Sequence, residues 1–374
     1  MLITDKKDLM QFASKERIWQ GIPSIERTEK GRMFSVFYSG NMMETWGNYV
    51  VLLKSDDDGK TWTEPIACAY DGLFSRCFDS ILWVDPKGRL WWCWSVMPVN
   101  SIWASVCDDP DAEELTWSEP RPIGGEVMMN RPTVLSDGNW LFPMAVWRDG
   151  VREKRITPSF GPEKLSFVYR TTDEGKTFRR IGGADVPERS FDEHMVLEKK
   201  DGSLLMLVRT FYGIGKSISK DGGCTWTPGE DSGIPGPCSR FHICRLASGR
   251  VLLVNNDDAH ERIKLSAWLS EDDGETWKGP LLLDERKDVS YPDAVERNGF
   301  IWITYDRERG DMKSCLEEAE KDAREILFAK ITEEDILAGA LVTESSSLRN
   351  IVSKLSGHYE KDTTELFNRN RWHM

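Results

Sequence analysis

The sequence predicts an all-β protein, a six-bladed β-propeller with four-stranded antiparallel blades. One eight-residue pattern recurs four times, and a hairpin pattern with a turn glycine recurs six times. Both have a pitch of roughly 50 residues, which is typical of propellers and other repeat folds. The 374 residues of the chain hold six such units. Because each unit is a series of short apolar strands separated by turn signals, we expect blades around a central channel.

The eight-residue pattern, called the box below, reads Ser/Thr-x-Asp-x-Gly-x-Thr-aromatic. Its Asp can bond back to the backbone and its Gly can adopt positive φ, which predicts a tight turn. The closing aromatic is a large apolar plug, so we expect Trp62, Trp226 and Trp277 to be structural. The four copies are Ser55–Trp62, Thr171–Phe178, Ser219–Trp226 and Ser270–Trp277, with a degenerate copy at Ser105–Trp117.

The hairpin pattern places the blades along the chain. Each copy is a short apolar strand, a Gly-bearing turn and a second apolar strand, and the turn glycines are 57, 50, 64, 47 and 50 residues apart. This predicts one domain, residues 1–374, with blades that start near residues 20, 78, 130, 192, 240 and 290. We expect an outer strand at Ile326–Ile331, then a C-terminal extension, 332–374, that opens with a short helix capped by Thr332. Residues 1–19 or 340–344 are the candidates for the strand that closes the ring.

Composition excludes several classes of function. The net charge is −13 and the acidic residues are dispersed, which argues against a nucleic-acid partner. No stretch of 18 apolar residues is present, so no membrane span is expected. The N-terminus lacks the apolar core of a signal peptide, and the eight cysteines form no CxxC pair, so we expect free thiols and a cytoplasmic location. The five histidines have no ligand spacing, so neither a metal nor another cofactor is expected.

Polar residues stand at the starts of the predicted inner strands, where apolar residues would be expected. Buried polar groups cost several kcal/mol unless they are paired. Their convergence therefore predicts a functional site at one mouth of the channel, the structural alternative being an axial salt-bridge network. The residues at or just before these strand starts, polar except for Gly21, Phe78 and Phe241, are Gln20, Gly21, Arg76, Phe78, Asp79, Asn130, Arg131, Asp192, Glu193, His194, Arg240, Phe241, His242, Tyr291 and Asp293.

The boxes are similar to the Asp-boxes, or BNR repeats, of the sialidase (neuraminidase) superfamily, and other segments resemble that family too. Glu193 precedes an apolar strand that ends at Arg209, and a box follows. This order resembles the family's catalytic glutamate, second carboxylate-binding arginine and Asp-box. Arg262 lies eight residues before a box, as the third arginine does, and Tyr291 lies in a segment similar to the one that carries the nucleophilic tyrosine.

The resemblance implies a sialidase-like glycoside hydrolase that acts on a terminal, acidic or otherwise modified sugar. Glu193 would polarise Tyr291, whose oxygen would attack the anomeric carbon, and Arg209 and Arg262 would bind the substrate. A tyrosine suits a sugar that carries its own negative charge, because a carboxylate nucleophile would be repelled.

The chain departs from the family in its first blade. Where sialidases have Phe/Tyr-Arg-Ile-Pro, this chain has Gln20–Pro23, so that Gly21 stands in place of the first arginine of the triad. Losing one bidentate arginine weakens the binding of a substrate carboxylate, and Arg240 or Arg131 would have to substitute. The acid/base is either Glu44, in the loop of the first blade, or Asp79, in the second.

Two other functions fit the same sequence. His194 and His242 begin adjacent inner strands, and a histidine with a tyrosine could move protons in a glycosidase or in a lyase of uronic-acid polysaccharides. A carbohydrate-binding propeller without catalysis would use an aromatic platform, for which Trp46 and Phe211–Tyr212 are candidates. Asp293 is the remaining candidate for substrate binding at the mouth.

Overall fold

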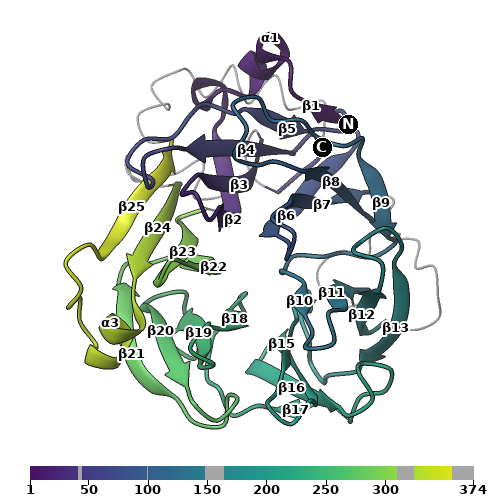
Figure 1. Ribbon diagram of the computed structural model, residues 1–374, viewed down its shortest axis with the longest axis vertical. Coiled ribbons are helices and arrows are strands. Elements are labelled where there is room, and N and C mark those ends of the chain that lie inside the picture. The colour runs from purple at the N-terminus through teal and green to yellow at the C-terminus, as the bar shows by residue number, and fades with distance from the viewer. Residues whose placement is uncertain (41–43, 99, 148–163, 310–323, 356–374) are drawn as a thin grey trace.

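Six antiparallel sheets surround a central axis in the computed structural model, which describes residues 1–40, 44–98, 100–147, 164–309 and 324–355 (Figure 1). Each sheet is one blade, and the inner strand of each blade lies nearest the axis. The predicted six-bladed β-propeller is therefore confirmed. No helix in these described ranges is long and apolar enough to cross a membrane.

Each blade is built from consecutive strands that run outward from the axis. Blade one consists of β2 (Trp19–Arg27), β3 (Met33–Gly40), β4 (Tyr49–Ser55) and β5 (Ala67–Ala69), and blade two of β6 (Arg76–Val84), β7 (Leu90–Met97), β8 (Ser101–Cys107) and β9 (Arg121–Gly124). Blade three consists of β10 (Thr133–Val134), β11 (Trp140–Ala145), β12 (Ser166–Thr171) and β13 (Arg179–Ala184). Blade four consists of β14 (Met195–Glu198), β15 (Leu204–Thr210), β16 (Gly213–Ser219) and β17 (Glu230–Asp231). Blade five consists of β18 (His242–Arg245), β19 (Val251–Asn256), β20 (Leu265–Ser270) and β21 (Lys278–Asp284), and blade six of β22 (Val289–Arg297), β23 (Phe300–Arg307), β24 (Glu325–Ile331) and β25 (Ser347–Lys354).

The ends of the chain complete the two neighbouring blades one and six. At the N-terminus, β1 (Leu2–Ile3) pairs with β5 as a fifth, outermost strand, and α1 (Lys6–Leu9) follows it. The helix α3 (Glu333–Ala338) has the predicted cap, a capping box between Thr332 and Asp335. Neither candidate for a closing strand joins two blades. Within residues 1–19, β1 pairs with β5 of its own blade, and residues 340–344 form no strand, because Asp335 accepts hydrogen bonds from the backbone N–H of Val342 and Thr343. The expectation that Ile326–Ile331 is the outer strand of blade six is also wrong, since β24 is the third strand and β25 lies outside it.

The ring closes through side chains rather than through exchanged strands. Asp293 of β22 accepts hydrogen bonds from Ser24 Oγ at 2.6 Å and from the backbone N–H of Ile25 at 3.1 Å. Gln20 Nε2 donates to the carbonyl oxygens of Arg324 and Ser353. Blades one and six are therefore joined by buried polar contacts along the first inner strand.

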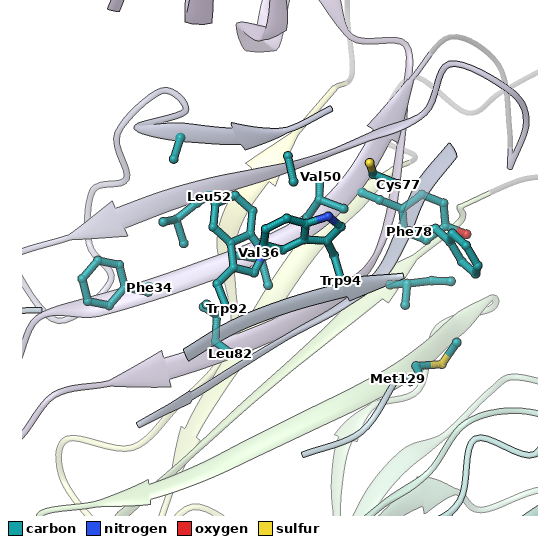
Figure 2. Packing of buried hydrophobic residues seen from close by; sticks show 14 of the residues in the cluster. Phe34, Val36, Val50, Leu52, Cys77, Phe78, Leu82, Trp92, Trp94 and Met129 are labelled. Atoms are coloured by element: carbon teal, nitrogen blue, oxygen red, sulfur yellow. The ribbon is translucent and has the colours of Figure 1, made fainter. Parts of the chain in front are cut away.

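Apolar faces of neighbouring blades pack against each other and form the core. Figure 2 shows the packing between blades one and two, where side chains of β3 and β4 face those of β6 and β7. Burial of such large apolar side chains is the dominant favourable term in folding. The buried side chains drawn there include Phe34, Val36, Val50, Leu52, Leu82, Trp92 and Trp94.

The boxes form hydrogen-bonded turns at the end of the propeller opposite the predicted mouth. Asp57 accepts from the backbone N–H of Thr61 at 2.9 Å, from Thr61 Oγ1 at 2.7 Å and from Ser55 Oγ at 2.8 Å. The same bonds recur at Asp173, Asp221 and Asp272. Bonds from the box threonine lower the pKa of Asp57 to about 2. These ionised aspartates thus stabilise the turns through hydrogen bonds.

The box tryptophans are less deeply buried than the core residues that the sequence predicted. Trp62 and Trp226 donate from Nε1 to the carbonyl oxygen of Gly59 and Gly223, and both rings are only partly buried. The Trp62 ring packs edge-on against Phe328 of blade six, with ring centroids 6.3 Å apart. Each box therefore fastens its turn to the preceding blade while one edge of the ring stays in water.

We predict that Trp226→Ala lowers the free energy of unfolding by about 1–3 kcal/mol, because it exposes a half-buried aromatic contact. Trp92→Ala, at a fully buried ring, should lower it by about 3–5 kcal/mol. Urea denaturation measures both. Unchanged stability together with lost sugar binding in Trp226→Ala would contradict a structural role for the box.

Candidate functional site

Irregular backbone at the mouth sets the site residues apart from the regular strands. Register shifts interrupt the pairing of β2, β6 and β22 near their first residues. Positive φ is rare for residues with a side chain and costs on the order of 1–3 kcal/mol, so the surrounding structure must impose it. Bulges of this kind redirect side chains. Positive φ occurs at these shifts in Ile22 (56°), Asp79 (46°) and Tyr291 (57°), and just before β14 in Glu193 (42°).

Tyr291, Glu193 and Arg209 form a closed hydrogen-bonded triangle. Tyr291 donates its hydroxyl proton to Glu193 Oε1 at 3.0 Å. Arg209 Nη1 donates to the same carboxylate oxygen at 2.6 Å and to the tyrosine oxygen at 2.9 Å. The three residues are 5%, 4% and 5% exposed. The structure thus brings together a tyrosine and a glutamate that are 98 residues apart in the sequence.

The surroundings keep Tyr291 neutral in the resting protein while guanidinium groups oppose that effect. Burial and the neighbouring Glu193 raise the pKa of Tyr291, and Arg209, Arg309 and Arg262 act to lower it. Glu193 Oε2 has no hydrogen-bond partner within the described part of the chain. The carboxylate therefore has a free oxygen beside the one that receives the tyrosine hydroxyl.

Two further arginines lie over the ring of Tyr291. The guanidinium carbon of Arg262 is 5.2 Å from the ring centroid, and that of Arg309 is 4.3 Å from it. Arg262 was predicted from the resemblance. The sequence offered no signal for Arg309, because it follows β23 outside any repeated pattern and reaches the site only through the fold.

The two candidates for the acid/base have opposite electrostatic surroundings. Burial acts to raise the pKa of Glu44, but Arg309 and Arg76 lower it to about 2, and Arg76 Nη2 lies 2.8 Å from its Oε2. Burial raises the pKa of Asp79 well above its usual range, with the charges of Glu44 and Glu193 adding to the effect. At neutral pH Glu44 is therefore ionised, whereas the surroundings of Asp79 favour its protonated form.

Four predicted substrate-binding residues are committed instead to a buried network along the axis. Arg131 donates to both oxygens of Asp293, at 2.9 and 2.8 Å, and to Glu26 at 2.7 Å. Arg240 donates to Asn130 at 2.7 Å and lies 3.5 Å from Asp293, and His242 Nδ1 lies 3.4 Å from it. Burial would raise the pKa of Asp293, but Arg131 and His242 hold it well below its usual range. Contrary to expectation, Arg131, Arg240, His242 and Asp293 build the axial salt-bridge network, and neither arginine fills the place of the missing one.

His194 also serves the fold. Its Nε2 lies 2.7 Å from the carbonyl oxygen of Phe167 in the neighbouring blade. Burial lowers the pKa of His194 to about 4, so its imidazole stays neutral. Among the described residues, neither His194 nor His242 forms a hydrogen bond with Tyr291.

Aromatic side chains are exposed close to the ends of the strands that carry the site. Phe211 and Tyr212, in the turn after β15, are 60% and 36% exposed, and Arg209 lies just before them. Trp46, the other predicted platform residue, packs against the core between blades one and two. Exposed apolar groups next to a polar site are typical of ligand-binding surfaces. Among the residues that the structure describes, no cluster of three or more His, Cys, Asp or Glu residues could hold a metal ion.

Comparison with known proteins identifies relatives of this architecture. Residues 75–303 match the BNR repeat-like domain family. A sialidase of Bacteroides fragilis (strain YCH46) is 26% identical over 315 residues, a match that covers 72% of this chain and 56% of that protein. The chain thus spans little more than half the length of this curated relative.

Solved structures of sialidases share the fold. The Hadza microbial sialidase Hz136 has a TM-score of 0.66 at 18% identity, covering 86% of this chain and 67% of its own. The leech intramolecular trans-sialidase complexed with 2,7-anhydro-Neu5Ac has a TM-score of 0.67 at 15% identity, covering 88% of this chain and 70% of its own. At this identity the likeness shows the propeller fold alone.

We predict that Asp293→Asn lowers the free energy of unfolding by about 3–5 kcal/mol, because it leaves buried guanidinium charge uncompensated. Thermal or urea denaturation measures the change, with Asp108→Asn at an exposed position of blade two as the control. Equal stability of the two variants would show that the axial network does not hold the ring together.

Proposed function

The chain belongs to the BNR repeat-like domain family, and from this premise we propose that it is a sialidase-like glycoside hydrolase acting on a terminal acidic sugar. The hydrogen-bonded triangle of Tyr291, Glu193 and Arg209 is the observation that carries the proposal. Buried tyrosine and carboxylate groups in contact, under a guanidinium group, are suited to nucleophilic catalysis.

In the first step the hydroxyl proton of Tyr291 passes to Glu193 Oε1, which already accepts its hydrogen bond at 3.0 Å. The tyrosine oxygen bonds to the anomeric carbon while the bond from that carbon to the leaving oxygen breaks. Arg209 Nη1, 2.9 Å from the tyrosine oxygen, stabilises negative charge on it. In the second step water replaces tyrosine at the anomeric carbon, and the tyrosine oxygen recovers its proton from Glu193.

Asp79 is the better candidate for the general acid. A general acid must hold a proton at working pH, and burial raises the pKa of Asp79 well above its usual range. Glu44, ion-paired with Arg76 at 2.8 Å, has a pKa of about 2. In this mechanism Asp79 protonates the leaving oxygen and then accepts a proton from the attacking water, while Glu44 orients the arginines.

Binding without catalysis is the alternative that a specific observation favours. The exposed Phe211 and Tyr212 offer an aromatic surface beside the triangle, and sugars stack on such surfaces. Hydrolysis of a panel of aryl glycosides of acidic and neutral sugars, with product analysis by mass spectrometry, separates the two functions. Absence of turnover together with saturable sugar binding would favour the binding propeller, and an unsaturated product would indicate a lyase.

We predict that Tyr291→Phe reduces turnover on the order of 10⁴-fold, because the nucleophilic oxygen is removed. The same change should alter the free energy of unfolding by only about 1–2 kcal/mol, since one hydroxyl and its hydrogen bonds are lost. Steady-state kinetics and thermal denaturation measure the two effects. Full activity of Tyr291→Phe would exclude the tyrosine mechanism.

We predict that Asp79→Asn slows hydrolysis of substrates with sugar leaving groups by roughly 10²- to 10⁴-fold, as loss of a general acid does. Activated aryl glycosides, whose leaving groups need no proton, should lose much less, and the alkaline limb of the pH profile should disappear. Glu44→Gln, the matched control, should lower both kinds of activity alike. If Glu44→Gln selectively slowed hydrolysis of substrates with sugar leaving groups, and Asp79→Asn lowered both kinds of activity alike, the general acid would be Glu44.

A further inference from the structure

Gly21 lacks a side chain because another side chain occupies its place. A Cβ atom built on Gly21 would lie only 2.7 Å from Cγ of Arg309 and closer still to Cδ. Gly21 is not among the glycines with positive φ, so its backbone conformation is open to other residues. The close approach of Arg309, rather than the turn, therefore requires glycine here.

Arg309 reaches this place from blade six, and one nitrogen of its guanidinium group lacks a hydrogen-bond partner in the described part of the chain. It follows the end of β23, and its side chain is 13% exposed. Its Nη1 lies 3.7 Å from both Glu44 and Asp306, too far for a hydrogen bond. This nitrogen is buried and has no hydrogen-bond partner in the described ranges of the chain. A buried donor of this kind is costly unless a ligand satisfies it.

The three guanidinium groups around Tyr291 are compensated unequally. Arg209 is paired with Glu193, whereas Arg262 donates to the carbonyl oxygen of Cys238 at 3.3 Å. Among the described residues, the carboxylates within 4 Å of Arg309 are those of Glu44 and Asp306, both at 3.7 Å. Guanidinium groups recognise planar carboxylates through paired hydrogen bonds. The site is thus prepared for an anionic group beside the tyrosine.

We infer that Arg309 binds the carboxylate of the substrate in place of the arginine that is absent at position 21. Gly21 of blade one leaves a space that the side chain of Arg309 fills. The guanidinium group therefore comes from blade six instead of blade one. This inference rests on the proposed acidic-sugar substrate. It also reverses the expectation that the missing arginine weakens carboxylate binding.

The first test is calorimetric binding of two probes to the full chain, the 2,3-unsaturated analogue of N-acetylneuraminic acid and its methyl ester. Arg309→Ala should weaken binding of the acid on the order of 10- to 100-fold, as loss of charge-assisted hydrogen bonds does, and should leave binding of the ester within about 3-fold. Arg250→Ala, at a partly exposed arginine of blade five paired with Glu271 and Glu333, is the control and should change neither.

The second test moves the arginine back to blade one. Gly21→Arg alone should weaken binding of the acid, because its side chain collides with Arg309. In Gly21→Arg combined with Arg309→Ala the collision is removed and a guanidinium group occupies the same space, so acid binding should recover at least about 10-fold relative to Arg309→Ala. Thermal denaturation verifies that each variant is folded.

The outcomes separate this inference from the proposed hydrolase. Acid-selective binding that depends on Arg309, without turnover, would support the inference and overturn the hydrolase. Turnover of acidic sugars with Arg309→Ala unimpaired would support the hydrolase and overturn the inference. Equal binding of acid and ester by the unmodified protein, or binding of neither, would also overturn it, as would failure of the double variant to recover.

Discussion

The pairing of the buried Asp293 carboxylate with groups of blades one and three is the interaction on which the rest of the molecule depends. The carboxylate receives hydrogen bonds from blade one, through Ser24 and Ile25, and from blade three, through Arg131. A carboxylate without these partners would be costly to bury in the axis of a propeller, and the guanidinium of Arg131 would be equally costly alone. Their pairing joins blades that share no strands. Because Asp293 lies two residues beyond Tyr291 in β22, the network that closes the ring also fixes the strand that carries the tyrosine.

Above this network the same ring of strand starts becomes a site lined by arginines. These arginines act differently on the two carboxylic groups there. Against the effect of burial, Arg309 and Arg76 lower the pKa of Glu44 to about 2, so that it is ionised, whereas burial raises the pKa of Asp79 well above its usual range. The pKa values of Glu44 and Asp79 are thus shifted in opposite directions, as in sites where one carboxyl group acts as the acid and another stays ionised. Positive φ at Asp79, Glu193 and Tyr291 shows that the backbone is held in unfavourable geometry to present these groups.

The two ends of the propeller have different roles, one structural and one carrying the candidate site. The boxes lie at the end away from Tyr291, and each holds its own turn together through bonds that span four residues or fewer. Their aspartates are ionised, and the hydrogen bonds of their carboxylates stay within the turn. The proposed chemistry lies at the other end, where the contact between Tyr291 and Glu193 joins blades six and four. This division explains why box repeats identify a fold and say little about a reaction.

The sequence by itself determined the six blades, the box turns and the capped helix, because these depend on patterns and hydrogen bonds that span a few residues. Through resemblance it also predicted Glu193, Tyr291, Arg209 and Arg262, which the structure places together. Only the tertiary structure decided how the polar ring divides into a network and a site, since Arg131 and Asp293 are 162 residues apart and either could have faced a substrate. It alone placed Arg309 over Gly21 and left the box tryptophans partly in water. Contacts between distant segments depend on how the blades meet, and no local pattern encodes that geometry.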